Sequence, residues 1–201
     1  MQLILATRNA HKTREIRRIL GPSFEVNDLS KYGEIPEINE TGGSFEENAQ
    51  LKAALVSRQL PGLIVADDSG LEVDALGGAP GIHSACYAGP ESSDAKNIEK
   101  LLGELSRVKA AGDQRSARFR CVLALAQRGR ILGTFCGMVE GKIANQPRGS
   151  GGFGYDPVFM PEGSDQTFAE LPAEGKDRVS HRARALEKLR AFLLAGEMRN
   201  A

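Results

Sequence analysis

Two adjacent carboxylates after a short apolar run constrain the fold of this chain more than any other feature. Residues 63–65 read Leu-Ile-Val, which is typical of a buried β-strand, and Asp67 and Asp68 follow where such a strand would end. Paired carboxylates at that position favour a cation site. Asp, Ser and Gly are also the residues that turns select, so residues 67–70 are compatible with a turn as well.

The first twenty residues predict a strand, a polar turn and a helix, in that order. Residues 3–6 form a continuous apolar run, and the apolar positions of residues 16–20 have the spacing of one buried helix face. The turn between them combines backbone N–H groups at a helix start with polar side chains, which predicts a phosphate site. In the alternative interpretation, Asn9 only caps the helix and Lys12 is solvated.

A second helix is predicted over residues 45–60, after a polar loop. Ser44 and Glu47 match the capping-box pattern at its start. At 100° per residue, Lys52 projects from the apolar face of this helix. Its side chain either snorkels along the edge of the core or reaches into a cleft.

The middle of the chain predicts further strands of both orientations. Residues 72–76 alternate as a strand does, and residues 94–105 carry a helical apolar stripe that Asp94 can cap. Alternation over residues 119–125 and an apolar run over residues 131–139 flank a short Arg-Gly-Arg segment. Together they indicate an antiparallel hairpin, and so a mixed sheet.

A glycine-rich segment, residues 147–157, is the second informative stretch. Closely spaced glycines let a backbone approach a ligand. Phe153 and Tyr155 would each offer a ring face for stacking on a base, which contributes ~1–3 kcal/mol when a nucleobase is the partner. The alternative is a glycine-rich turn with an ordinary core aromatic residue.

The last helix is predicted to begin after Ser180, which can cap it. His181 and Arg182 then lie in its first turn, where positive side chains are unfavourable with the helix dipole. Either an anionic or carbonyl-bearing ligand accounts for these two residues, or both are solvated.

Length and composition exclude several classes of protein. A chain of 201 residues with 41% hydrophobic and 26% charged residues suits a single domain over residues 1–201. No apolar run approaches the ~20 residues of a membrane span, and the first residues do not resemble a signal peptide, so we expect a cytoplasmic protein that does not contact membrane. The 26 basic and 26 acidic residues balance, which argues against nucleic acid as a partner.

A carboxylate pair, a donor-rich turn and an aromatic glycine segment are together the parts of a nucleoside triphosphate site. The chain resembles the inosine triphosphate pyrophosphatase family. The resemblance covers nearly the whole chain and rests on five ordered blocks, TRNAHK, ETGGSFEENAQLKA, ADDSGLEVDALGGAPG, PRGSGGFGYDP and SHRARAL.

This resemblance implies a fold, a reaction and partners. The fold would be α/β, a long mixed β-sheet flanked by helices, with two lobes and the active-site cleft between them. The enzyme would be a homodimer that uses Mg²⁺. It would hydrolyse the purine nucleoside triphosphates ITP, dITP and XTP to the nucleoside monophosphate and pyrophosphate, removing deaminated purines from the nucleotide pool.

The resemblance also implies roles for individual residues. Asp68 would accept the proton of the attacking water, and Glu40 and Asp68 would be Mg²⁺ ligands. Glu37, Lys52 and Asp67 are candidate supporting residues. The implied substrate-binding residues are Thr7, Arg8, Asn9, Ala10, His11, Lys12, Ser69, Phe153, Gly154, Tyr155, Asp156, Lys176, His181 and Arg182.

Two of these roles raise chemical questions. A carboxylate bound to Mg²⁺ is a poor base, so the two roles of Asp68 conflict unless one oxygen serves each. A donor such as Arg182 would favour the 6-oxo group of hypoxanthine or xanthine, because a buried donor that faces the amino group of adenine stays unpaired.

The chain departs from the family pattern at Cys86, where members usually carry Arg. Loss of that cation would weaken activity or assembly, or would be neutral. Two other functions compete with the first: a related enzyme for pyrimidine or methylated nucleotides, and a nucleotide-binding protein without turnover.

Overall fold

A computed structural model describes residues 1–33, 35–36 and 38–200 of the chain, with side chains described through residue 196. The candidate supporting residue Glu37 lies outside the described residues. The strands are β1 (Gln2–Leu5), β2 (Glu25–Asp28), β3 (Leu63–Val73), β4 (Ser116–Gln127), β5 (Arg130–Ile143) and β6 (Phe159–Pro161). The helices are α1 (Ala10–Leu20), α2 (Phe45–Gln59), α3 (Asp94–Arg107), α4 (Ala173–Val179) and α5 (His181–Asn200).

The strands of the described residues form one sheet in the order β2-β1-β3-β4-β5-β6. β1 pairs in parallel with β2 and with β3, whereas β5 pairs antiparallel with β6. Arg128 and Gly129, with φ angles of 52° and 79°, form the two-residue turn between β4 and β5, as a type I′ hairpin requires. The predicted α/β fold with a mixed sheet is therefore confirmed.

The chain divides into two compact units. Unit 1 comprises Met1–Asp68, Cys121–Gly137 and His181–Ala201, and unit 2 comprises Ser69–Arg120 and Met138–Ser180. The active-site cleft that we expected between two lobes stays a prediction.

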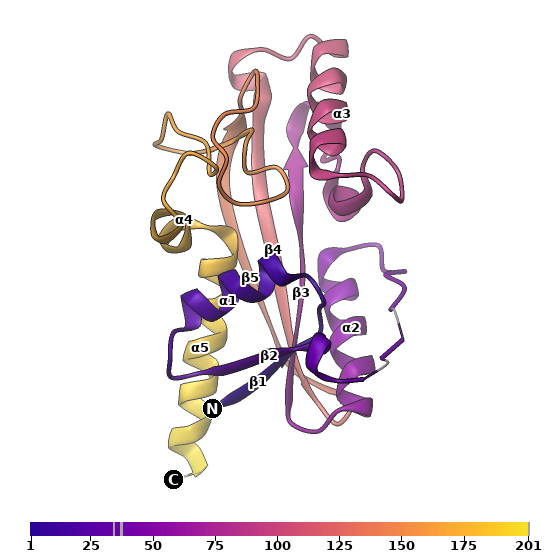
Figure 1. The fold of residues 1–201 in the computed structure, drawn as a ribbon, viewed down its shortest axis with the longest axis vertical. Coiled ribbons are helices and arrows are strands. Elements are labelled where there is room, and N and C mark those ends of the chain that lie inside the picture. The colour runs from indigo at the N-terminus through magenta and orange to yellow at the C-terminus, as the bar shows by residue number, and fades with distance from the viewer. Residues whose placement is uncertain (34, 37, 201) are drawn as a thin grey trace. The chain divides into compact units, whose positions relative to one another are not determined.

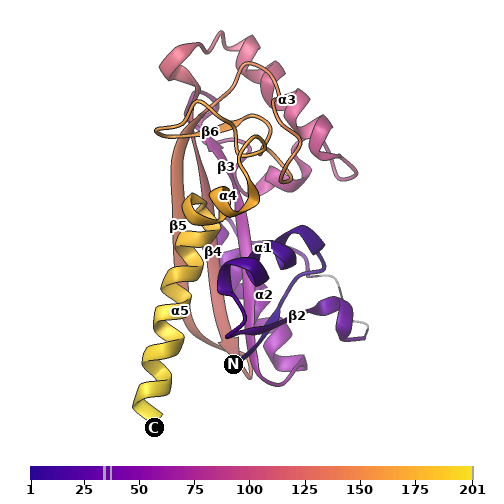
Figure 2. The ribbon, with the colours of Figure 1, turned by 60° about the vertical axis from the view of Figure 1, so that its left-hand side comes forward.

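In unit 1, helices cover both faces of the strands (Figure 1). α1 and α5 pack against each other on one face, while α2 lies on the other. α5 also runs beside the hairpin of β4 and β5 (Figure 2), where the rings of Phe135 and Phe192 lie 5.3 Å apart. The core on the α1 and α5 face consists of Leu3, Leu5, Ile16, Leu20, Phe24, Val26, Val65, Cys121, Leu123, Leu125, Phe135, Ala185, Leu186, Leu189 and Leu193.

The structure corrects the prediction that β3 ends near Asp67. β3 is one continuous strand from Leu63 to Val73, so residues 67–70 form no turn, and residues 74–76 form a short 3₁₀ helix rather than a strand. It is β1 that ends here, since Leu5 pairs with Val65 and β1 goes no further. Among the described residues, no strand therefore pairs with β3 on the β1 side at Asp67 and Asp68, although both residues are buried.

In unit 2, α3 packs its apolar stripe into a separate core that includes Leu101, Leu105, Tyr155 and Phe159. Ser93, not Asp94 as predicted, caps α3, and its side chain accepts a hydrogen bond from the Lys96 amide at 3.3 Å. Asp94 is therefore available for another contact.

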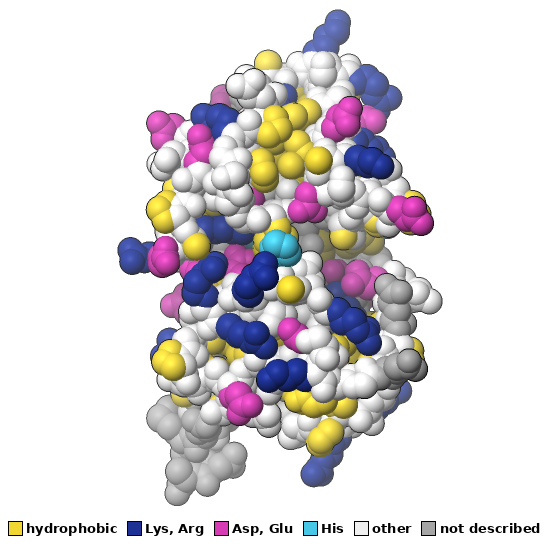
Figure 3. All heavy atoms as spheres, in the orientation of Figure 1, with side chains coloured by type: hydrophobic (Ala, Val, Ile, Leu, Met, Phe, Trp, Pro, Cys, Tyr) yellow, Lys and Arg dark blue, Asp and Glu magenta, His cyan; other side chains and the backbone are white. Residues whose placement is uncertain are grey.

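Within the described residues, no helix is both long and apolar enough to cross a membrane. On the face of the molecule in Figure 3, basic and acidic side chains are interspersed. This mixture of charges agrees with the balanced composition.

Candidate active site

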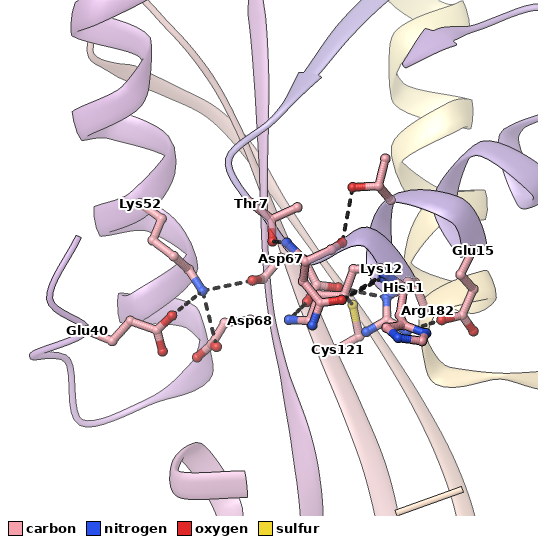
Figure 4. A network of polar contacts seen from close by, with 12 residues as sticks. Thr7, His11, Lys12, Glu15, Glu40, Lys52, Asp67, Asp68, Cys121 and Arg182 are labelled. Carbon is pink, nitrogen blue, oxygen red and sulfur yellow. Dashed lines mark hydrogen bonds and ion pairs between the residues drawn. The ribbon is translucent and has the colours of Figure 1, made fainter. Parts of the chain in front are cut away.

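Asp67 and Asp68 belong to two different groups of polar side chains in unit 1. Successive side chains of a β-strand point to opposite faces of the sheet. Asp67 therefore points toward α1 and α5, while Asp68 points toward α2 (Figure 4). The pleat of β3 is what separates the roles of two neighbouring carboxylates.

Asp67 lies in a buried network of charges. Its Oδ1 forms an ion pair with Nζ of Lys12, and its Oδ2 accepts a hydrogen bond from Nε of Arg182 at 2.9 Å. Arg182 in turn donates through a second nitrogen to Glu15 at 2.6 Å, and the thiol of Cys121 lies 3.2 Å from Oδ2 of Asp67. Lys12 is thus held by a carboxylate, contrary to the interpretation that it is solvated.

The charges of this network shift the pKa of Asp67. Burial works to raise the pKa, but the positive charges of Arg182 and Lys12 outweigh it and hold the pKa of Asp67 well below its usual range. Burial beside Asp67 raises the pKa of the Cys121 thiol far above its usual value. Asp67 is therefore a permanent anion at neutral pH, and Cys121 stays a thiol.

Lys52 is the centre of the group on the other face. Its Nζ lies 2.8 Å from Oε1 of Glu40, 2.8 Å from the carbonyl oxygen of Asp67 and 3.3 Å from Oδ1 of Asp68. Burial lowers the pKa of Lys52, but attraction to Asp68 and Glu40 prevails, so the pKa is raised. Lys52 is buried and paired, so it does not snorkel to solvent, while the cleft into which it was expected to reach stays a prediction.

Asp68 is buried, and one of its carboxylate oxygens accepts no hydrogen bond from the described residues. The residue is 5% exposed, and its Oδ2 has no hydrogen-bond partner among the described residues. Burial raises the pKa of this carboxyl; Lys52 opposes the shift and Glu40 adds to it. A buried carboxylate oxygen without a partner is costly, so Oδ2 of Asp68 is suited to receive a proton or a cation.

The loop that carries Glu40 is held by α2. The side-chain oxygen of Asn48 accepts from the Gly42 amide at 2.8 Å, and the Glu47 carboxylate accepts from the Gly43 amide at 2.7 Å. Glu40 itself keeps a side chain that is 40% exposed. The helix start therefore positions an accessible carboxylate beside Lys52 and Asp68.

A divalent metal fits this carboxylate pair. No group of three or more His, Cys, Asp or Glu side chains within the described part of the chain is arranged to hold a metal by protein ligands alone. Mg²⁺ does not need such a cage, because it binds one or two carboxylates and completes its shell with water and substrate phosphates. The carboxylates of Glu40 and Asp68 are donors of the kind that it prefers.

More polar groups of the turn after β1 have hydrogen-bond partners within the protein than predicted. Asn9 caps α1, and its side-chain oxygen accepts from the amides of His11 and Lys12 at 2.9 and 3.1 Å. Thr7 accepts from the Asn9 amide at 3.0 Å. Arg8 donates to the carbonyl oxygen of Ile35 at 2.6 Å, so it holds the following loop. Ala10 is the first residue of α1.

A close approach of β5 and α5 places His181 and Arg182. A Cβ atom on Gly137 would lie 2.1 Å from the carbonyl oxygen of His181, so only glycine permits this packing. α5 begins directly after Ser180, as predicted, and His181 is 4% and Arg182 1% exposed. Neither is solvated. Asp67 and Glu15 supply the anions that the position of Arg182 required.

The remaining predicted residues lie in unit 2, and most of them form one cluster. Nζ of Lys176 lies 2.5 Å from Oδ2 of Asp156 and 4.9 Å from the ring centroid of Phe153. Oδ2 of Asp156 also accepts from the Phe153 amide at 2.9 Å. The ring of Tyr155 is buried in the core, and its hydroxyl donates to the carbonyl oxygen of Ser84 at 2.9 Å, so the half-buried Phe153 is the ring better placed to meet a base.

Ser69, the other predicted residue of unit 2, follows Asp68 in β3 and is half-buried.

Sequence reasoning missed Glu15 and the contact made by Cys121. Glu15 is 3% exposed and lies one residue before Ile16, on a helix whose apolar stripe was recognised. A charged residue beside such a stripe is more often solvated, and no local pattern predicts a partner 167 residues away. Cys121 is fully buried, and its contact with Asp67, 54 residues away in the sequence, likewise has no local signal.

The chain is similar to known proteins over nearly its whole length. The Ham1 family matches residues 3–192. A dITP/XTP pyrophosphatase of Bacillus licheniformis is 50% identical over 193 residues, which cover 96% of this chain and 97% of that protein. The dITP/XTP pyrophosphatase of Bacillus subtilis is 48% identical over 195 residues, covering 96% and 98%. The structure of the Staphylococcus aureus Ham1 protein aligns with a TM-score of 0.85 and 40% identity over 98% of this chain and 100% of that chain.

Proposed function

Because the chain belongs to the Ham1 family, we propose that it hydrolyses ITP, dITP and XTP to the nucleoside monophosphate and pyrophosphate. The similar proteins of Bacillus licheniformis and Bacillus subtilis are named dITP/XTP pyrophosphatases, which supports this substrate class. The observation that carries the proposal is the buried Oδ2 of Asp68, which has no partner among the described residues and lies beside Lys52 and Glu40.

We assign the proton transfer to Asp68. The oxygen of a water forms a bond to the α-phosphorus while the bridging P–O bond breaks, and pyrophosphate leaves with the electron pair. The water proton passes to Oδ2 of Asp68, whose pKa is already raised by burial. Oδ1 of Asp68 lies 3.3 Å from Nζ of Lys52 and would be the oxygen that binds Mg²⁺. Each carboxylate oxygen then has one task.

Glu40 and Asp68 would hold Mg²⁺ against the substrate. When bound, this ion offsets the charge of the triphosphate and of the leaving pyrophosphate. Lys52 fixes the two carboxylates relative to each other. Lys12 and the turn of Thr7 to Lys12 supply the remaining positive charge and donors for the phosphates.

For the base, we propose that Phe153 stacks on the purine and that Gly154, Tyr155, Asp156 and Lys176 support it. His181 remains a candidate contact. Arg182 acts through Asp67 instead of touching the base, because its side chain is 2% exposed and its guanidinium is paired with two carboxylates. Ser69 completes the proposed substrate contacts.

We further propose a cytoplasmic homodimer in which residues 1–201 act as a single catalytic domain, without nucleic acid or membrane as partners. The Ham1 family match supports one domain, since it extends across both units.

A nucleotide panel tests the proposed function. The protein is incubated with ITP, XTP, dUTP, GTP or ATP and Mg²⁺, and released pyrophosphate is measured. We expect release from ITP and XTP far above release from GTP and ATP, and its loss when EDTA removes the metal. A preference for dUTP would favour the pyrimidine enzyme, and the absence of product with every nucleotide would favour a binding protein.

A further inference from the structure

Two successive backbone amides in the aromatic glycine segment of unit 2 are each bound by a carboxylate. The Phe153 amide donates to Oδ2 of Asp156 at 2.9 Å, and the Gly154 amide donates to Oδ2 of Asp94 at 2.6 Å. Asp156 belongs to the same segment, but Asp94 is on α3, 60 residues earlier in the chain. The second contact therefore fixes the segment to a helix that was not predicted to take part in the site.

Asp94 is free to make this contact because it is not the helix cap. Ser93 accepts from the Lys96 amide and so caps α3. The Asp94 carboxylate, in the first turn of α3, points to Gly154 instead. A carboxylate acceptor gives a shorter and stronger hydrogen bond with an amide than a neutral acceptor does.

The contact fixes the peptide next to the proposed base-stacking ring. Phe153 and Gly154 share the peptide bond whose N–H is bound by Asp94, and the ring of Phe153 lies 4.9 Å from Nζ of Lys176. Asp94, Phe153 and Gly154 line one cavity of about 560 Å³, together with Ile98, Glu99 and Leu102 of α3. Gly154 has a φ of +61°, a conformation that glycine adopts readily. Because Gly154 has no side chain, contacts to its backbone hold this peptide.

We propose that Asp94 is a positioning residue that presents Phe153 to the purine base by binding the Gly154 amide. This inference rests on the proposed function, because it takes the base as the partner of Phe153. Asp94 does not touch the reacting phosphate in this role. It limits the orientations of the ring before substrate arrives, so less freedom is lost on binding.

Three variants separate this role from a general effect on the helix. Asp94→Ala removes the acceptor and the charge. Asp94→Asn keeps an acceptor oxygen but removes the charge that favours a helix start. Glu99→Ala removes an exposed carboxylate on the same helix and the same cavity and serves as the matched control.

Steady-state kinetics with ITP and Mg²⁺ give the first readout. We expect Asp94→Ala to raise KM by about three- to tenfold, the range expected for the loss of one solvent-exposed hydrogen bond, with kcat nearly unchanged. Asp94→Asn should restore most of the affinity, and Glu99→Ala should match the wild type. An unchanged KM in Asp94→Ala, no rescue by Asp94→Asn, or an equal rise in Glu99→Ala would each overturn the positioning role.

Amide hydrogen exchange of Gly154, followed by NMR without substrate, gives the second readout. Exchange should be faster in Asp94→Ala than in the wild type and in Glu99→Ala. Equal exchange rates would show that Asp94 does not hold the peptide, whatever the substrate. If the wild type released no pyrophosphate from any nucleotide, the proposed function would fail, and a faster Gly154 exchange in Asp94→Ala would still support the contact itself.

Discussion

Nε of Arg182 donates to Oδ2 of Asp67 at 2.9 Å across 115 residues of sequence, and both side chains are only 2% exposed. This hydrogen bond joins the first turn of α5 to the middle of β3. Because the same guanidinium also donates to Glu15, one cation neutralises two buried carboxylates. The position of Asp67 beside the proposed metal site thus depends on the C-terminal helix.

Arg182→Ala should lower the free energy of unfolding by about 3–5 kcal/mol, the range for removing one partner of a buried ion pair. The reason is that Asp67 and Glu15 lose a common cation and stay buried. Urea denaturation followed by circular dichroism measures the change. Arg107→Ala is the control, since Arg107 pairs with Glu104 through a side chain that is 75% exposed, and such pairs contribute about 1 kcal/mol or less. A loss for Arg182→Ala as small as that of the control would contradict the prediction.

The lowered pKa of Asp67 predicts how stability responds to acid. Between the folded pKa and the unfolded value of about 3.9, the unfolded chain binds more protons than the folded one, so stability rises with pH there. The contribution of Asp67 is fully present above the unfolded pKa and is lost as the pH falls through the folded pKa. Unfolding free energies of the wild type and Asp67→Asn, compared at a series of pH values around and below the unfolded pKa of about 3.9, should show a shallower slope in the variant. Parallel curves would mean that Asp67 is not held as an anion.

Asp68→Asn should reduce kcat for ITP by about 10³-fold or more while leaving the protein folded, because the amide cannot accept the water proton and is a weaker ligand for Mg²⁺. Pyrophosphate release measures the rate, and circular dichroism verifies the fold. Asp113→Asn, at an exposed carboxylate of unit 2, should behave as the wild type. Turnover of the Asp68 variant within tenfold of the wild type would remove Asp68 as the base.

Gly137→Ala should destabilise the protein by about 1–3 kcal/mol, the usual cost of overpacking, and displace the start of α5. The added methyl group would meet the carbonyl oxygen of His181 and the amide nitrogen of Ala185, which are backbone atoms that cannot rotate away. Gly103→Ala, at a helical glycine with open space where the Cβ atom would lie, should instead stabilise the protein by up to about 1 kcal/mol. Thermal melts of the two variants check the opposite signs, and equal shifts would refute the packing argument.

Local patterns predicted the elements of this fold better than the partners of its charged residues. The strand and helix of the first twenty residues and the hairpin at Arg128 and Gly129 follow from periodicity and turn chemistry, which act over a few residues. The end of β3 was misplaced because two adjacent carboxylates are typical of a turn. They lie within the strand at the point where the neighbouring β1 has ended, and the sequence pattern does not give the length of β1 relative to β3. The contacts of Glu15 with Arg182 and of Asp94 with Gly154 depend on the tertiary fold, which periodicity does not encode.

The early end of β1 has a consequence for solubility. Among the described residues, no strand pairs with β3 on the β1 side beyond Val65, whose carbonyl oxygen accepts from the Ala6 amide. An open edge of this kind invites strand addition from another molecule. The Asp67 carbonyl, two residues on, points to the same side, where it accepts from Nζ of Lys52. Lys52 therefore takes the hydrogen-bonding place of the missing strand, and its charge blocks that edge against aggregation.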